Sequence, residues 1–256
     1  LVRVGLIQSS LIWHDPIANC DYFEQRIEEL SNDVDLVLLP EMFTTGFTMN
    51  SSTVAEGMDG PTVQWMRSQA AKSGSVIGGS LVIREEGHYF NRFVWMRPNG
   101  QASIYDKRHL FRMAGEHLYY TPGKKRVVVT LGDFRICLTI CYDLRFPVFF
   151  RSKNDYDVLL CVANWPSERQ DAWETLLKAR AIENQAYVIG VNRLGSDGSD
   201  IHYRGGTAVY NYLGETLERS LDRDSTFVIE IHKAALENYR KAFPVSADAD
   251  RFEVQT

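Results

Sequence analysis

Apolar runs alternate along this chain with segments whose apolar residues recur at helical spacing. Two of these runs, Ile136–Ile140 and Val158–Val162, are apolar on both faces, which is typical of strands in the middle of a covered sheet. Further strands are expected near 2–9, 34–39, 75–83, 88–97, 101–107, 127–130, 187–191, 205–212 and 226–231. Helices are expected at 22–30, from Gly60-Pro61 onward, at 168–185 and at 233–242.

Helices and strands alternate for much of the chain, yet several strands follow one another as hairpins. This mixture predicts a layered α/β protein with mixed sheets rather than a purely parallel sheet. No linker, low-complexity segment or internal repeat interrupts the pattern, so a single domain over 1–256 is expected. Residues 108–125 show no period and are interpreted as a long loop; loops of this length in a compact domain are usually functional or disordered. The polar residues 243–256 are expected to be mobile or to dock on a partner.

Composition narrows the class of protein further. A chain with 45% hydrophobic and 24% charged residues is ordinary for a soluble globular protein. The net charge of −5 and the lack of a basic run make nucleic acid an improbable partner. No apolar run reaches the ~18 residues that a membrane span needs, and the first residues resemble a strand rather than a signal peptide.

The chain has four cysteines: Cys20, Cys137, Cys141 and Cys161. Their spacings suggest neither a zinc site nor a disulfide framework. Reduced thiols in a cytoplasmic protein fit this pattern. Cys137 and Cys161 lie inside apolar strands, where free cysteines usually act as small hydrophobes.

Cys141 differs, because it lies where an apolar strand ends and a polar turn begins. Two other chemically useful side chains, Glu41 and Lys107, also follow directly on predicted strands. If those strands are neighbours, a carboxylate, an ammonium and a thiol converge, which suits acyl transfer. A free thiol is mostly protonated at neutral pH, so Glu41 would take its proton while Lys107 stabilises the thiolate and then the oxyanion. Each residue alone has a purely structural explanation, and only the combination favours catalysis.

The segments Leu38-Leu-Pro-Glu-Met42, Tyr105-Asp-Lys-Arg-His109 and Thr139-Ile-Cys-Tyr-Asp-Leu-Arg-Phe146 together resemble the nitrilase, or carbon–nitrogen hydrolase, superfamily. The resemblance extends to Asn164-Trp-Pro166 and Arg180-Ala-Ile-Glu-Asn-Gln185. Within the superfamily, Arg112-Met-Ala-Gly-Glu-His117 and the cysteine motif are most similar to the omega-amidase branch. The resemblance implies a four-layer α-β-β-α sandwich, a homodimer, and a fourth functional carboxylate at Glu116.

The activity implied by this resemblance is hydrolysis of the terminal amide of small 2-oxo dicarboxylic acid monoamides through a cysteine thioester. The backbone N–H of Tyr142 would assist Lys107 in holding the oxyanion, and the implied mechanism needs no metal or organic cofactor. Arg145 and Arg112 are the candidates for binding the far carboxylate of the substrate, with Tyr119 or Trp165 as pocket wall. A structural ion pair is an equally good interpretation of either arginine.

Other interpretations remain open. An N-carbamoyl amino acid amidohydrolase or a nitrilase would use the same three catalytic residues. A Cys-His hydrolase would draw on His109 or His117, which lie near Lys107 in the sequence. A non-catalytic interaction protein with this fold would be expected to have lost one of the three, and none is lost.

Overall fold

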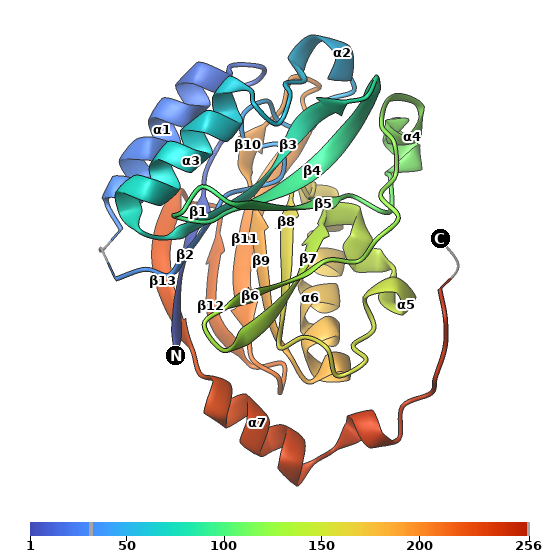
Figure 1. Ribbon diagram of the computed structural model, residues 1–256. Coiled ribbons are helices and arrows are strands. Elements are labelled where there is room, and N and C mark those ends of the chain that lie inside the picture. The colour runs from blue at the N-terminus through green and yellow to red at the C-terminus, as the bar shows by residue number, and fades with distance from the viewer. Residues whose placement is uncertain (31–32, 255–256) are drawn as a thin grey trace.

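The computed structural model describes residues 1–30 and 33–254, and two stacked sheets dominate it (Figure 1). The first sheet has six strands in the order β13–β1–β2–β3–β4–β5. Their bounds in that order are Ser225–Ile231, Val2–Gln8, Leu36–Leu38, Val76–Glu85, His88–Met96 and Ala102–Asp106. β1, β2 and β3 are parallel, and the remaining pairs are antiparallel.

The second sheet has seven strands, six of them in the order β10–β11–β9–β8–β7–β6, with β12 paired to β11. Their bounds are Leu194–Ser196, His202–Tyr210, Tyr187–Asn192, Val158–Ala163, Phe134–Ile140, Val128–Leu131 and, for β12, Thr216–Leu221. β7, β8 and β9 are parallel and central, while the outer pairs are antiparallel. Both sheets are therefore mixed, as the sequence predicts.

Period-two alternation in the strands of the first sheet builds two separate hydrophobic layers. Leu36 and Leu38 of β2 pack between the sheets, where they join the apolar residues of β7 and β8. Val37 of β2 and Ile77 of β3 point the other way, against helices α1 (Pro16–Glu28) and α3 (Pro61–Ser73). These two helices cover the outer face of the first sheet (Figure 1).

Helix α6 (Gln170–Asn184) covers the outer face of the second sheet and completes the four layers. It approaches β9 closely because Gly190 has no side chain: a Cβ there would lie 2.6 Å from Leu177 and 2.8 Å from Trp173. The layers run helix, sheet, sheet, helix, which confirms the predicted α-β-β-α sandwich. None of the helices in residues 1–30 and 33–254 has the length and apolar character to cross a membrane.

Several short elements were not predicted from the sequence. They are α2 (Ser51–Val54), α4 (Glu116–Tyr119), α5 (Pro147–Phe150), the edge strands β10 and β12, and the 3₁₀ turns η1 (Arg112–Ala114), η2 (Cys141–Arg145), η3 (Ser167–Arg169) and η4 (Val245–Ala247). The expected loop 108–125 thus contains η1 and α4. β12 was not predicted because it shows no run of buried apolar residues: its first four residues are exposed, as is common in an edge strand.

The C-terminal helix α7 (Lys233–Ala242) packs beside the lower end of the second sheet. After it, residues 243–254 run along the outside of the body, where Lys153 Nζ donates to the Phe252 carbonyl at 2.9 Å. The end of the expected tail, 255–256, lies outside the described residues. Whether this segment docks on a partner stays a prediction.

Candidate active site

Cys141 lies at the carboxyl end of the central strand β7, as the first residue of the turn η2. Its backbone φ is +47°, a left-handed conformation that costs a non-glycine residue about 1–3 kcal/mol. The side chain is buried, and its Sγ lies 3.7 Å from the carbonyl oxygen of Asn164. The sharp turn lifts the thiol out of the strand and into the space between the sheets.

The side chain of Asp143, also in η2, stabilises this turn. Its buried carboxylate accepts the Ile140 amide at 3.1 Å and the Tyr105 hydroxyl at 2.6 Å. The same carboxylate accepts the backbone N–H of His109 at 2.9 Å and lies 2.8 Å from His109 Nδ1. Asp143 therefore ties the turn that carries Cys141 to the segment that carries Lys107.

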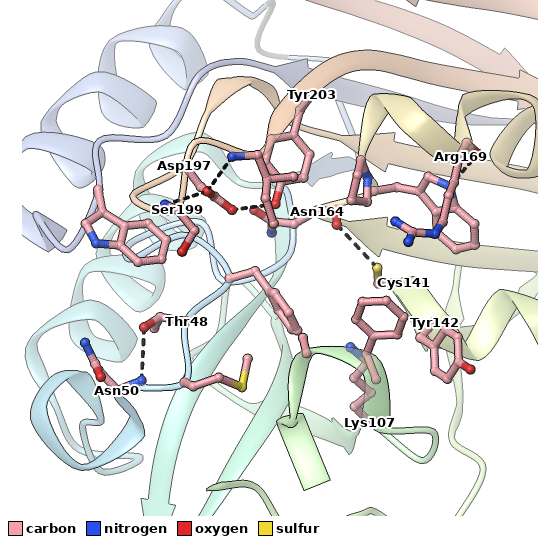
Figure 2. Close-up of a pocket in the computed structure, with 18 of the residues that line it drawn as sticks. Thr48, Asn50, Lys107, Cys141, Tyr142, Asn164, Arg169, Asp197, Ser199 and Tyr203 are labelled. Atoms are coloured by element: carbon pink, nitrogen blue, oxygen red, sulfur yellow. Dashed lines mark hydrogen bonds between the residues drawn. The ribbon is translucent and has the colours of Figure 1, made fainter. Parts of the chain in front are cut away.

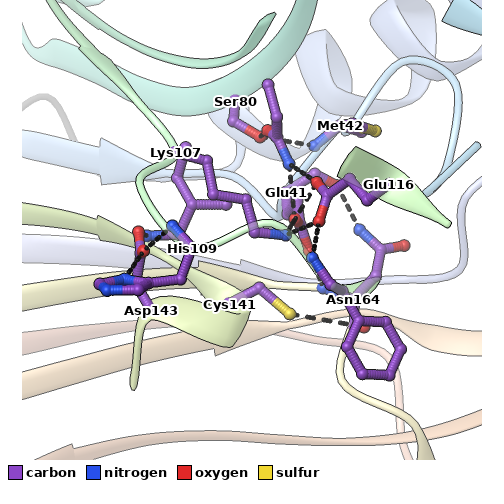
Figure 3. Close-up of polar contacts among 12 residues, drawn as sticks. Glu41, Met42, Ser80, Lys107, His109, Glu116, Cys141, Asp143 and Asn164 are labelled. Carbon is purple, nitrogen blue, oxygen red and sulfur yellow. Dashed lines mark hydrogen bonds and ion pairs between the residues drawn. The ribbon is translucent and has the colours of Figure 1, made fainter. Parts of the chain in front are cut away.

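Lys107 follows β5 directly and lies between two carboxylates (Figure 3). Its Nζ is 3.0 Å from Glu41 Oε1 and 3.0 Å from both carboxylate oxygens of Glu116. All three side chains are at most 1% exposed. The structure thus brings Glu41, Lys107, Glu116 and Cys141 together from four separate segments.

Glu41 is oriented by amide groups from both sheets. Asn91 on β4 donates to its Oε1 at 2.7 Å, and the backbone N–H of Asn164 donates to its Oε2 at 2.8 Å. Asn91 is itself fixed by Ser80, whose hydroxyl donates to the Asn91 side-chain oxygen at 2.8 Å. The Asn164 side-chain nitrogen binds the Glu41 carbonyl, so Asn164 bridges β8 to the segment after β2.

Burial and charge set the protonation of this cluster. Burial by itself lowers the pKa of Lys107, but Glu116 and Glu41 together raise that pKa well above its usual value. The pKa of Glu116 is raised by burial, against the lowering effect of Lys107. Burial also raises the pKa of the Cys141 thiol, and the Glu41 carboxylate raises it further, while Lys107 opposes both. The lysine is therefore cationic and the resting thiol protonated at neutral pH.

The thiol faces a cavity of about 410 Å³ (Figure 2). Lys107, Asn164 and Tyr142 line its floor beside Cys141. Its walls are largely aromatic: Trp13, Phe47, Phe111, Trp165 and Tyr203. A cavity of this size suits a small molecule, and the Cys141 thiol is part of its lining.

The structure separates the candidates for substrate binding that the sequence suggested. Tyr142, Arg145 and Trp165 line the cavity, whereas Arg112 and Tyr119 do not. Arg112 is exposed in η1, and Tyr119 is 49% exposed at the end of α4. The short helical turns of this segment direct Glu116 inward and leave those two side chains outside.

Sequence reasoning missed several residues of the site. Asn91 and Ser80 lie in largely apolar strands. A polar side chain in such a strand is the sequence signal that could have identified them as residues of the site. Asn164 was noted in a motif but given no role, and Asp143 follows Cys141 by two positions without having been considered. Arg169 of η3 lines the cavity and was also not singled out.

The histidine alternative finds little support in the geometry. His109 is bound by Asp143 and stacks on Phe146 with ring centroids 3.9 Å apart. His117 is not among the residues that line the cavity. Within the described ranges 1–30 and 33–254, no three His, Cys, Asp or Glu side chains gather as a metal site would require.

The sequence of this chain is similar to known enzymes along nearly its whole length. The family model described as carbon–nitrogen hydrolase matches residues 3–241. The omega-amidase YafV of Escherichia coli strain K12 is 45% identical over 254 residues, covering 99% of this chain and 98% of that protein. The 2-oxoglutaramate amidase of Bacillus subtilis strain 168 is 31% identical over 250 residues, covering 96% of each.

A solved structure is also closely similar. It is a CN-hydrolase superfamily protein from Xanthomonas campestris with an arsenic adduct in its active site. Its TM-score is 0.97 and its identity is 46%, with 99% of both chains covered.

Proposed function

Because the chain belongs to the carbon–nitrogen hydrolase family, we propose that it hydrolyses the terminal amide of small 2-oxo dicarboxylic acid monoamides, such as 2-oxoglutaramate and 2-oxosuccinamate. The observation that carries the chemistry is the buried cluster in which Lys107 lies between Glu41 and Glu116 beside Cys141. The similarity to an omega-amidase and to a 2-oxoglutaramate amidase over nearly the whole chain supports the choice of substrate.

In the first half of the reaction, Glu41 takes the proton of Cys141 and the thiolate attacks the amide carbon. A base is needed because the resting thiol is protonated, its pKa being raised by burial and by Glu41. Lys107 Nζ and the backbone N–H of Tyr142 stabilise the oxyanion; one such donor is typically worth ~2.7–4 kcal/mol. Glu41 then returns the proton to the leaving nitrogen, so ammonia departs and a thioester remains on Cys141.

In the second half, Glu41 takes a proton from water and the resulting nucleophile attacks the thioester. The tetrahedral intermediate uses the same oxyanion donors, and its collapse releases the 2-oxo dicarboxylic acid and restores the thiol. Glu116 keeps the ammonium of Lys107 at a fixed position throughout, since both of its oxygens bind Nζ.

The test is ammonia release from a substrate panel. The panel comprises 2-oxoglutaramate, 2-oxosuccinamate, glutamine, asparagine, an N-carbamoyl amino acid and a simple nitrile. The proposal predicts the highest kcat/KM on the two 2-oxo amides. A higher value on the carbamoyl compound or the nitrile would assign the chain to a different reaction of the superfamily, and no turnover at all would favour a non-catalytic role.

We also propose that the chain forms a homodimer through the outer side of its second sheet. Exposed apolar side chains on that side support this: Ile182 of α6 is 49% exposed and Val148 of α5 is 60% exposed. Sedimentation velocity over a range of concentrations tests the dimer, and a constant monomer mass would reject it.

We further propose a cytoplasmic location, which the four free cysteines support.

A further inference from the structure

Two guanidinium groups line the cavity without being neutralised. Among the described residues, Arg145 has neither an ion-pair partner nor a hydrogen-bond partner, and its guanidinium lies 5.0 Å from the ring centroid of Trp165. Arg169 has one carboxylate within 4.0 Å, that of Glu168 at 3.9 Å, and the Glu168 side chain is 81% exposed. Its other contacts are with the Phe111 ring and with the sulfur of Met113.

These two arginines contrast with Arg92 and Arg240 elsewhere in the fold, which are held by carboxylates. Arg92 forms close ion pairs with Asp106 and Glu85, and Arg240 pairs with Asp157. In the cavity, aromatic rings hold the cations instead, which leaves their hydrogen-bond donors available. Two unneutralised guanidiniums in one small cavity indicate a site for an anion.

Trp165 contacts the Arg145 guanidinium and the backbone of Arg169. Its ring lies beneath Arg145, and its indole N–H donates to the carbonyl oxygen of Arg169 at 2.8 Å. Trp165 is only 3% exposed and directly follows Asn164, whose carbonyl contacts Cys141 Sγ. The buried segment Asn164-Trp165 thus lies between the thiol and the two arginines that line the same cavity; Figure 2 shows Cys141, Asn164 and Arg169 around it.

The cavity offers no comparable site for a cation. Its only acidic lining residue among those described is Asp197. That carboxylate already accepts the Tyr203 hydroxyl at 2.8 Å and the backbone N–H groups of Ser199 and Ile201 at 2.8 and 3.1 Å. An α-ammonium group placed near the two arginines would meet like charge without compensation.

We propose that Arg169 is a specificity-determining residue that, together with Arg145, binds the carboxylate and neighbouring 2-oxo oxygen at the end of the substrate remote from the amide. This inference rests on the function proposed above and adds the groups that select its substrate. A 2-oxo acid presents several oxygen acceptors side by side, which suits two guanidinium forks. The same pair of cations selects against glutamine and asparagine, which carry an ammonium where the 2-oxo acid carries a ketone.

The test compares a charged amide with a neutral one in wild type and in Arg169→Met. We expect kcat/KM on 2-oxoglutaramate to fall about 10- to 100-fold, as for the loss of a charge-assisted hydrogen-bond pair. With pentanamide, which has the same chain length but no carboxylate, kcat/KM should change less than about threefold, since that substrate makes no such bond. The preference for 2-oxoglutaramate over glutamine should shrink accordingly.

Three further variants make the result specific to this side chain. Arg169→Lys keeps the charge but loses the fork, so it should fall between wild type and Arg169→Met. Arg67→Met, an exposed arginine on α3, is the matched control and should leave both substrates unaffected. The third variant is Arg112→Met. If it loses kcat/KM on 2-oxoglutaramate alone while Arg169→Met is unaffected, the role belongs to Arg112 and the inference is overturned.

Binding measurements keep the inference testable if pentanamide turns over too slowly. In a Cys141→Ala background, calorimetry should show weaker binding of 2-oxoglutaramate when Arg169→Met is added, with unchanged thermal unfolding. Equal affinity in the two proteins would overturn the role of Arg169 while leaving the proposed reaction intact. A wild-type enzyme that does not prefer 2-oxo amides would instead reject the proposed function itself.

Discussion

Cys141 combines a strained backbone with a side chain whose charged form is disfavoured. Its φ of +47° is held by the four hydrogen bonds that Asp143 accepts, and burial together with Glu41 raises its pKa. A preformed thiolate would be available to any electrophile that enters the cavity. In the proposed reaction, by contrast, the protonated thiol beside Glu41 reacts only when a substrate is in place to receive the negative charge.

Lys107 is the residue that opposes this rise in pKa, so its replacement separates charge from geometry. Lys107→Met should raise the pKa of Cys141 further, and iodoacetamide labelling at a given pH should become slower. Lys107→Arg keeps a cation near the thiol, so its labelling profile should stay closer to wild type. Both variants should lose kcat by about a hundredfold or more, because a shift of ~1 Å at the oxyanion donor is enough for that.

Steady-state kinetics and the pH dependence of labelling provide the two readouts. Turnover of Lys107→Arg within a few-fold of wild type would mean that Lys107 supplies general electrostatic stabilisation rather than a positioned donor.

Cys137, which lies on β7, is a suitable contrast to Cys141, the proposed nucleophile that directly follows this strand. Cys141→Ala should abolish turnover, whereas Cys137→Ala should keep it and lose about 1 kcal/mol of stability as a small core truncation. Cys137 is fully buried on the same strand, and burial raises the pKa of its thiol to about 12. Ammonia release and urea unfolding measure the two effects, and full inactivation by Cys137→Ala with an intact fold would reverse the assignment.

Among the elements, the long apolar strands and the amphipathic helices were predictable, because burial imposes a period that is visible in the sequence. The convergence of Glu41, Lys107 and Cys141 was predictable for the same reason, since each follows the end of such a strand. The functional role of Glu116 could be predicted only from the family resemblance. The residue lies in α4, a single helical turn that is too short to show a period of apolar residues.

The direction of the loop side chains could not be predicted. Arg112 is only five positions from Lys107 yet points outside the cavity, while Arg169, far away in sequence, lines it. The contacts of Asn164 and Asn91 with Glu41 depend on how the strands pack, and no local pattern encodes that packing.

The buried carboxylate of Asp157 contributes to anchoring helix α7 on the second sheet. Asp157 precedes β8 and forms ion pairs with Lys233 and Arg240 of α7 and with Arg135 of β7. Burial alone would raise the pKa of Asp157, but Arg135 and Lys233 outweigh it and hold that pKa well below its usual value. The charged form is therefore the one that stabilises the fold.

Asp157→Asn should destabilise the protein by roughly 3–5 kcal/mol at pH 7, because three cations lose a buried partner. The folded-state pKa is lowered, so this contribution is present above the unfolded pKa of ~3.9 and is lost as pH falls below it. The difference between wild type and variant in urea unfolding should therefore be large at pH 7 and smaller at pH 3. Asp222→Asn, which removes an exposed pair with Arg204, is the matched control and should change little. An equal difference at both pH values would contradict the assignment.

At the scale of the whole molecule, the site exists only because two sheets stack. Glu41 and Lys107 follow strands of the first sheet, while Cys141 and Asn164 follow strands of the second. The bonds from Asn164 to Glu41 cross between the two sheets and hold the Glu41 carboxylate, the proposed base, in place. The stacked sheets thus supply a buried interface, and the ends of their strands place these four side chains in it.

The central claim is that amide hydrolysis proceeds through a thioester on Cys141. The direct measurement is peptide mass spectrometry of enzyme quenched in acid during turnover of 2-oxoglutaramate. We predict that the peptide containing Cys141 gains the mass of one 2-oxoglutaryl group without the amide nitrogen, and that the adduct disappears when substrate is exhausted. An adduct on Cys137 or Cys161, or continued ammonia release with Cys141 never acylated, would contradict the mechanism.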